Sequence, residues 1–179
     1  MIKYNYKGDE VLNITFKKDD FVVYGKNGVC CIEDIKTMTF AGIRGDYYIL
    51  KPQAGYSSTV YIPVTNEALV EKIRPVMSKK QIDTLLEDTD TQNLEWIEVK
   101  NERIEKFNQI LSSGDNKALL GLIMCVYRKK QEKEALGKSL SSTDENILRL
   151  ARELIEEEFA FSLGCPKENV ADYIQKKLK

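Results

Sequence analysis

The stretch FKKDDFVVYGKNGVCCIEDI, residues 16–35, decides the fold of the first part of this chain. It holds two runs rich in β-branched and aromatic residues, at 21–24 and 29–35, and such runs favour β-strands. The residues GKNG between them supply two glycines and an asparagine, which suit a tight turn. The stretch therefore predicts a β-hairpin.

Further strands follow the predicted hairpin. The segments 47–50, 59–62 and 70–73 are rich in β-forming residues, and a proline closes each of them, at 52, 63 and 75. Counted with the hairpin, these five short strands predict a small, strongly bent sheet or barrel. Residues 1–15 fit an extra hairpin, IKYNY-KGDE-VLNIT, or a loose arm.

The second part of the chain carries helical patterns. Apolar residues recur at helical spacing in 79–87, 102–111, 116–135, the segment after Ser142 and the segment after Pro166. Ser142 and Glu145 fit a capping box, and the polar residues 88–93 fit a linker. Strands followed by helices predict an α+β chain. We expect an extension at 1–15, a β domain at 16–77 and an all-helical domain of about five helices at 78–179.

Composition limits the function classes. The chain has 179 residues, of which 42% are apolar and 31% charged, as in soluble globular proteins. It contains no histidine, so the commonest general base and metal ligand are missing, and its four cysteines form no C-x-x-C pair. We expect no enzyme, no metal, no cofactor and no small-molecule substrate. The chain has no apolar run of membrane-spanning length and no signal-peptide pattern, so we expect a cytoplasmic protein without membrane contact.

Trp96 is the only tryptophan, and it lies at the start of LEWIEVKNERIEKF, residues 94–107. A helix extended back to Trp96 would place Lys100 in the middle of the apolar stripe, so Trp96 should precede the helix and Ile97 should be the core residue. Two alternatives remain open. The ring packs under the linker, or it is exposed beside Lys100 and Arg103, where an aromatic ring can wedge into a base step or stack on a base.

The segments DDFVVYGKNGVCCIEDI, YYILKP, VYIPV and IRPVMSKKQID together resemble the N-terminal domain of CarD/CdnL transcription factors, a module also found in transcription-repair coupling factor. The segments LEWIEVKNERIEKFNQILSSGD, YRKKQEKEALGKSLSSTDE and LARELIEEEFAFSLG resemble the helical domain of clostridial CarD-type regulators. The resemblance extends from about Phe16 to Tyr173.

The resemblance implies a Tudor-like sheet that binds the β subunit of bacterial RNA polymerase, partly by pairing strands. It also implies a helical domain that lies against promoter DNA at the upstream edge of the open bubble and alters the stability of the open complex. Trp96 aligns with the family's wedge residue. The implied DNA-binding residues are Trp96, Lys100, Arg103, Arg128, Lys129 and Lys130, and the implied polymerase-binding residues are Met38, Val60, Tyr61 and Ile62.

The chain departs from the family pattern at several charged positions. Actinobacterial members carry arginines where this chain has the neutral residues Met38 and Tyr61, and Glu98 and Glu102 lie among the basic residues near Trp96. The net charge is −1, so DNA binding should be weak alone and should depend on tethering by polymerase. The alternative is a polymerase-binding adaptor whose helical domain binds another protein through the acidic run ELIEEEF, residues 153–159.

Overall fold

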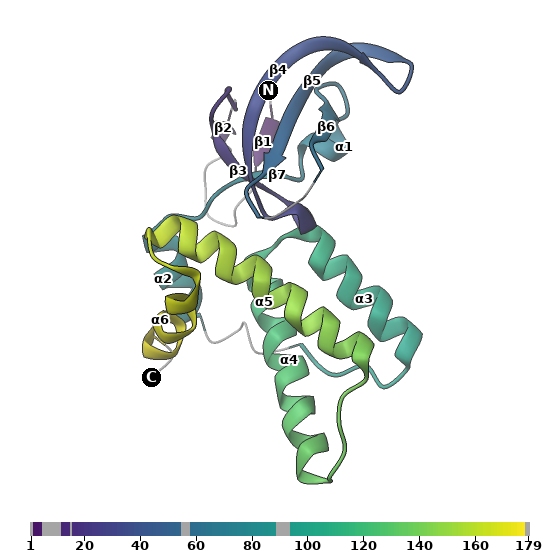
Figure 1. Ribbon diagram of the computed structural model, residues 1–179, viewed down its shortest axis with the longest axis vertical. Coiled ribbons are helices and arrows are strands. Elements are labelled where there is room, and N and C mark those ends of the chain that lie inside the picture. Colours follow the sequence, from purple (N-terminus) through teal and green to yellow (C-terminus); the bar gives the residue numbers. More distant parts are fainter. Residues whose placement is uncertain (1, 5–11, 15, 55–57, 89–93, 178–179) are drawn as a thin grey trace. The chain divides into compact units, whose positions relative to one another are not determined.

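The computed structural model describes residues 2–4, 12–14, 16–54, 58–88 and 94–177 (Figure 1). The chain divides into two compact units, Met1–Val76 and Met77–Lys179. Strands make up most of the first unit and helices make up the second, so the predicted α+β class is confirmed. The linker predicted at residues 88–93 lies largely outside the described residues.

The first unit is a five-stranded antiparallel sheet, and the predicted hairpin forms its β3 and β4. A single 3₁₀ turn, Gly25–Asn27, joins the two strands. Gly25 and Gly28 adopt positive φ angles of 49° and 64°, which glycine allows without steric cost. The strands are β3 (Phe21–Tyr24), β4 (Val29–Phe40), β5 (Ile43–Pro52), β6 (Val60–Pro63) and β7 (Ile73–Pro75).

The sheet differs from the sequence prediction in two ways. β4 and β5 are longer than predicted and form a curved hairpin (Figure 1), whose turn at Ala41 and Gly42 has φ angles of 49° and 80°. The segment predicted as the fifth strand begins with a short helix, α1 (Glu67–Val70), and β7 follows it. The strand order β6-β5-β4-β3-β7 has two ends among the described strands, so the sheet is open and the barrel alternative is wrong.

Residues 1–15 contribute two strands, β1 (Ile2–Tyr4) and β2 (Leu12–Ile14), which pair antiparallel in a separate sheet. This pairing agrees with the extra hairpin, although the residues that join the strands lie outside the described ones. The core of the first unit covers one face of the larger sheet. Its buried side chains include Phe16, Val22, Ile32, Leu50, Ile62 and Ile73.

The second unit contains five α-helices in its described part, as predicted. They are α2 (Lys79–Glu87), α3 (Lys100–Ser113), α4 (Asn116–Ala135), α5 (Ser142–Leu163) and α6 (Val170–Lys177). Gly114 ends α3 in the left-handed conformation, and the Asp115 side chain caps α4 by accepting a 2.7 Å hydrogen bond from the Ala118 N–H. None of the described helices is long and apolar enough to cross a membrane.

The N-terminal cap of α5 lies one residue earlier than predicted. The Ser141 hydroxyl accepts a hydrogen bond from the Asp144 N–H at 3.2 Å and donates one to the Asp144 carboxylate at 2.6 Å. Ser142 and Glu145 are therefore not the capping pair. This shift of one residue matters for the site, because it turns Asp144 toward the interior, where its exposed fraction is only 1%.

The second unit begins at Met77, and α5 anchors this residue. The Met77 N–H donates a 2.9 Å hydrogen bond to the buried Glu158 carboxylate, which also accepts one from the Asn116 amide at 2.8 Å. The Ser162 hydroxyl donates to the Met77 carbonyl. The apolar core beside this network includes Phe107, Leu119, Leu122, Ile155 and Phe159. Because Glu158 is buried here, it does not belong to an exposed acidic surface.

Candidate functional site

The strand β6 lies at one end of the larger sheet and pairs only with β5 among the described strands. Val60, Tyr61 and Ile62 therefore lie on an edge strand of the described sheet. Antiparallel ladders alternate between residue pairs that exchange hydrogen bonds and pairs that do not. The side of β6 that faces away from β5 thus carries unpaired backbone groups from alternate residues.

The register of β6 identifies those groups. Just beyond the strand, the Val64 N–H donates to the Asp46 carbonyl at 2.8 Å, so position 64 is one whose backbone faces β5. Counting back along the register, Ile62 and Val60 bond to β5, whereas the N–H and C=O of Tyr61 point to the open edge. Pro63 occupies the other outward position. Because proline has no N–H, its place there costs no hydrogen bond to β5.

The outer face of this edge is apolar and aromatic. The Tyr61 ring stacks on Phe40 with centroids 4.5 Å apart, and Phe40 meets the Tyr47 ring edge-on at 6.1 Å. Phe40 is 42% exposed and Ile43 is 63% exposed. Met38 has the strand parity of Phe40, so Met38 and Tyr61 lie on one face of the sheet.

Trp96 lies in an irregular segment, residues 94–99, immediately before α3, as the sequence predicts. The exposure expected for the wedge alternative is not found, because the ring is half-buried and packs against the core of the helical unit. The Phe107 ring contacts it edge-on with centroids 6.1 Å apart. Ile97, the expected core residue, does not belong to that core, whereas Trp96 and Leu94 pack against it.

Arg103 occupies a different place from the one that the sequence predicts. Its side chain is buried, with 8% exposed, and it forms two hydrogen bonds to the Asp144 carboxylate, at 3.1 and 3.2 Å. Its guanidinium carbon lies 4.2 Å from the centroid of the Trp96 ring. A buried, fully engaged guanidinium is not available to a DNA phosphate, so Arg103 does not belong to a surface of phosphate-binding residues.

The electrostatics of Asp144 follow from this pairing. Burial by itself raises the pKa of the Asp144 carboxyl, but the hydrogen bonds from Arg103 and Ser141 together with the charges of Arg103 and Lys133 outweigh it. The net result is a pKa below the ordinary value. Asp144 therefore stays charged, and the pair Arg103–Asp144 is a buried salt bridge between α3 and the first turn of α5.

Lys129 of α4 lies on the same side of the unit as Trp96. Its ammonium is 5.6 Å from the centroid of the indole ring and 3.0 Å from the Glu98 carboxylate. This hydrogen bond lowers the pKa of Glu98 and raises that of Lys129. The neighbouring Arg128 donates a 3.0 Å hydrogen bond to the Leu94 carbonyl. α4 thus holds the Trp96 segment at both of its ends.

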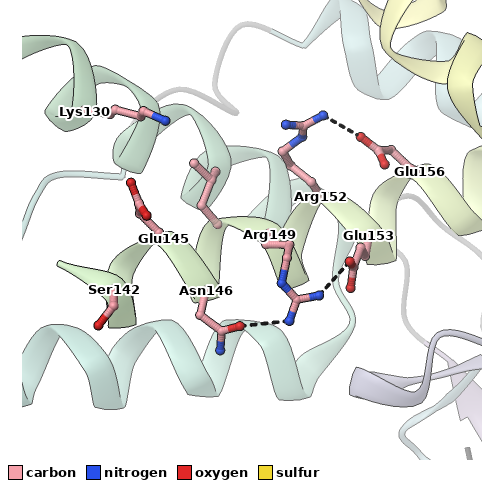
Figure 2. A pocket seen from close by; sticks show the side chains of 9 residues that line it. Lys130, Ser142, Glu145, Asn146, Arg149, Arg152, Glu153 and Glu156 are labelled. Atoms are coloured by element: carbon pink, nitrogen blue, oxygen red, sulfur yellow. Dashed lines mark hydrogen bonds and ion pairs between the residues drawn. The ribbon is translucent and has the colours of Figure 1, made fainter. Parts of the chain in front are cut away.

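The remaining predicted cations do not all join this cluster. Lys100 is exposed at the first turn of α3. Lys130 faces a groove of about 610 Å³ between α4 and α5 (Figure 2). In that groove Arg149 and Arg152 are bonded to Glu153 and Glu156, at 2.7 and 3.0 Å. The predicted patch is therefore divided, with Arg128 and Lys129 bonded to the segment that holds Trp96 and Lys130 on the α5 side.

Sequence reasoning missed Asp144, the residue that holds Arg103. The only available signal was its place three residues after Ser141, which makes it the acidic member of a capping pair. No periodicity in the sequence links residues 41 positions apart, so the pairing with Arg103 was not predictable. Among the described residues no cluster of three or more His, Cys, Asp or Glu side chains could hold a metal ion.

Comparison with known proteins agrees with the sheet unit. Residues 16–77 match the family CarD-like/TRCF RID domain. No curated protein matches the chain. The match is consistent with a CarD/CdnL family protein and suggests a transcription regulator that binds RNA polymerase. It ends before α2, the first helix of the second unit, so it does not support the more specific resemblance to the clostridial regulators.

Proposed function

We propose that this protein, whose residues 16–77 form a CarD-like/TRCF RID domain, binds the RNA polymerase β subunit through the open β6 edge and contacts promoter DNA through the helical unit. Binding there alters the lifetime of the open promoter complex. The observation that carries the polymerase half is the free N–H and C=O of Tyr61 at the end of the sheet. An added strand pairs with such groups directly.

The polymerase contact can be tested at a single backbone atom. Tyr61→Pro removes an outward N–H without removing a bond to β5, whereas proline at Val60 would break the sheet itself. Tyr61→Ala is the matched control, because it removes the ring and keeps the N–H. We expect Tyr61→Pro to bind a β-subunit fragment much more weakly than Tyr61→Ala in a pull-down. Equal binding by the two variants would contradict strand pairing at this edge.

The DNA half of the proposal rests on the surroundings of Trp96. An aromatic ring beside Lys129, in an irregular segment that Arg128 bonds at Leu94, has the composition of a minor-groove wedge with phosphate-binding neighbours. Lys100, Lys129 and Arg128 supply the cations in this proposal, and Lys130 supplies a separate contact. Glu98 competes with phosphate for Lys129, which agrees with weak DNA binding in the absence of polymerase.

The DNA contact can be tested by the decay of open complexes. We expect Trp96→Ala to remove most of the protein's effect on the decay rate, while pull-down by polymerase stays unchanged. Phe161→Ala is the matched control, because it truncates another aromatic residue of the same unit, one that is 43% exposed. If Trp96→Ala and Phe161→Ala behave alike, the DNA contact does not depend on the indole.

The adaptor alternative is less well supported. Of the acids in residues 153–159, Glu153 and Glu156 are paired with arginines, and Glu158 is buried. The run therefore does not form a uniform acidic face for a protein partner. Crosslinking to promoter DNA that depends on salt, measured with polymerase present, distinguishes the hypotheses, because contacts to DNA phosphates release counterions and an adaptor that does not touch DNA makes no such contacts.

A further inference from the structure

The guanidinium of Arg103 contacts three parts of the helical unit at once. Nε and Nη2 bond to the Asp144 carboxylate, and Nη1 donates to the carbonyls of Ile97 and Glu98 at 2.7 and 3.1 Å. The guanidinium also lies over the Trp96 ring at 4.2 Å. The same group therefore holds the backbone of the Trp96 segment, the start of α5 and one side of the indole.

We propose that Arg103 is the positioning residue of Trp96, setting the orientation in which the indole is presented to DNA. This inference rests on the proposed function, because it assigns Arg103 to the presentation of the proposed wedge rather than to a phosphate. The need for such a residue follows from the backbone. Residues 94–99 belong to no helix or strand, so regular hydrogen bonding does not fix the direction of the ring.

The chemistry of arginine suits this role and that of lysine does not. A planar guanidinium carries five donors in a rigid fork, so it can bond to a carboxylate on one edge and to carbonyls on another while its face covers an aromatic ring. A lysine ammonium is a single point of charge and cannot make these contacts together. Arg103→Lys therefore keeps the charge and removes the alignment.

The carboxylate that orients Arg103 is itself fixed. Asp144 lies in the first turn of α5, where the Ser141 hydroxyl donates to it and where the helix N-terminus favours negative charge. The start of α5 thus determines the place of Asp144, Asp144 orients Arg103, and Arg103 orients Trp96. Removing the carboxylate with Asp144→Asn should therefore disturb the indole through Arg103.

The test uses the indole as its own probe, since Trp96 is the only tryptophan in the chain. The full-length protein is compared with Arg103→Lys, Asp144→Asn and the control Arg149→Lys. The control makes the same change in an exposed arginine of α5 that is paired with Glu153. Tryptophan emission, acrylamide quenching and the decay of open complexes are measured at a temperature where circular dichroism shows every variant to be folded.

We expect the quenching constant of Arg103→Lys to rise about twofold, because the guanidinium no longer covers the ring. Its emission should shift, and its effect on open-complex decay should fall toward that of Trp96→Ala. Arg149→Lys should match the wild type in all three measurements. Asp144→Asn should change in the same direction as Arg103→Lys.

The outcomes separate this inference from the proposed function. If Arg103→Lys only lowers the melting temperature, and emission, quenching and decay stay at wild-type values, Arg103 is merely structural and the inference is wrong. If emission and quenching change but neither the wild type nor Trp96→Ala alters open-complex decay, Arg103 positions the ring as inferred and the proposed DNA function fails instead.

Discussion

The β6 edge and the Trp96 segment make their proposed contacts with different chemical groups. At β6 the groups are the backbone N–H and C=O of Tyr61, which any residue except proline would supply. In the helical unit the contact depends on particular side chains, because Trp96 is held by Arg103, which is held in turn by the buried Asp144. The comparison teaches that the first surface tolerates side-chain replacement, whereas the second does not.

The burial of charge sharpens this contrast. The pair Arg103–Asp144 is almost completely removed from solvent, with side chains 8% and 1% exposed. The aromatic stack of Phe40 and Tyr61 contains no charge and stands partly in solvent. Breaking a buried ion pair leaves one charge without a partner, whereas trimming a partly exposed ring removes only contact area. Substitutions should therefore differ widely in cost between the two regions.

The largest effect should come from Asp144→Ala. This change leaves the Arg103 guanidinium buried without its carboxylate, which costs about 3–5 kcal/mol of unfolding free energy. Urea unfolding followed by circular dichroism measures the loss. Asp115→Ala is the control, because it removes only a helix cap, at a cost of about 1 kcal/mol. Similar losses of unfolding free energy for the two variants would contradict the extra cost of leaving Arg103 buried without its carboxylate.

Acid should weaken the same pair without removing a side chain. The folded-state pKa of Asp144 is below its ordinary value, so the unfolded chain binds a proton more readily than the folded one. The stability from this group is then present above about pH 4–5 and is lost as the pH falls through the folded-state pKa. The gap in unfolding free energy between the wild type and Asp144→Asn, measured from pH 7 to pH 3, should narrow in acid. A gap independent of pH would contradict the depressed pKa.

Trp96→Ala should have an intermediate effect on stability. Truncating a fully buried tryptophan costs about 3–5 kcal/mol, and this ring is only half-buried, so we expect roughly 2 kcal/mol. The value is measured by thermal unfolding with circular dichroism, because the variant lacks its fluorophore. A loss of unfolding free energy near zero would mean that the indole is exposed, as the wedge alternative expects. A loss above about 3–5 kcal/mol would mean that Trp96 serves only the core.

Tyr61→Ala should cost less, about 1 kcal/mol, through the lost stack on Phe40. Thermal unfolding of the full chain provides the measurement, with Phe21→Ala as the control, because it truncates another aromatic ring of the same sheet, on β3, away from the β6 edge. A cost comparable to that of Asp144→Ala would contradict the tolerance that we assign to the sheet edge.

The smallest effect should be that of Arg149→Ala. Its ion pair with Glu153 is spaced i,i+4 along α5 and both side chains are about half exposed, so the loss should be about 0.5 kcal/mol or less. Raising the salt concentration should remove even this difference. A larger loss would show that the groove in Figure 2 contributes to the stability of the unit.

Short-range features of the chain were determined by the sequence itself. The turn at GKNG, the helix α2, the cap at Asp115 and the stop at Gly114 were all predictable, because each depends on residues a few positions apart. The position of Trp96 before α3 followed from the placement of Lys100 in the helical register. The resemblance of residues 16–77 to the RID domain depended on the same kind of local pattern.

Only the tertiary structure decided which of the predicted site residues act together. Arg103 and Lys129 are both basic and both close to Trp96, yet one is buried against Asp144 and the other reaches Glu98 from α4. Lys129 and Lys130 are adjacent in sequence and lie on different sides of α4, because each helical residue turns by about 100°. These differences arise from contacts between segments far apart in the chain, and packing alone selects such contacts.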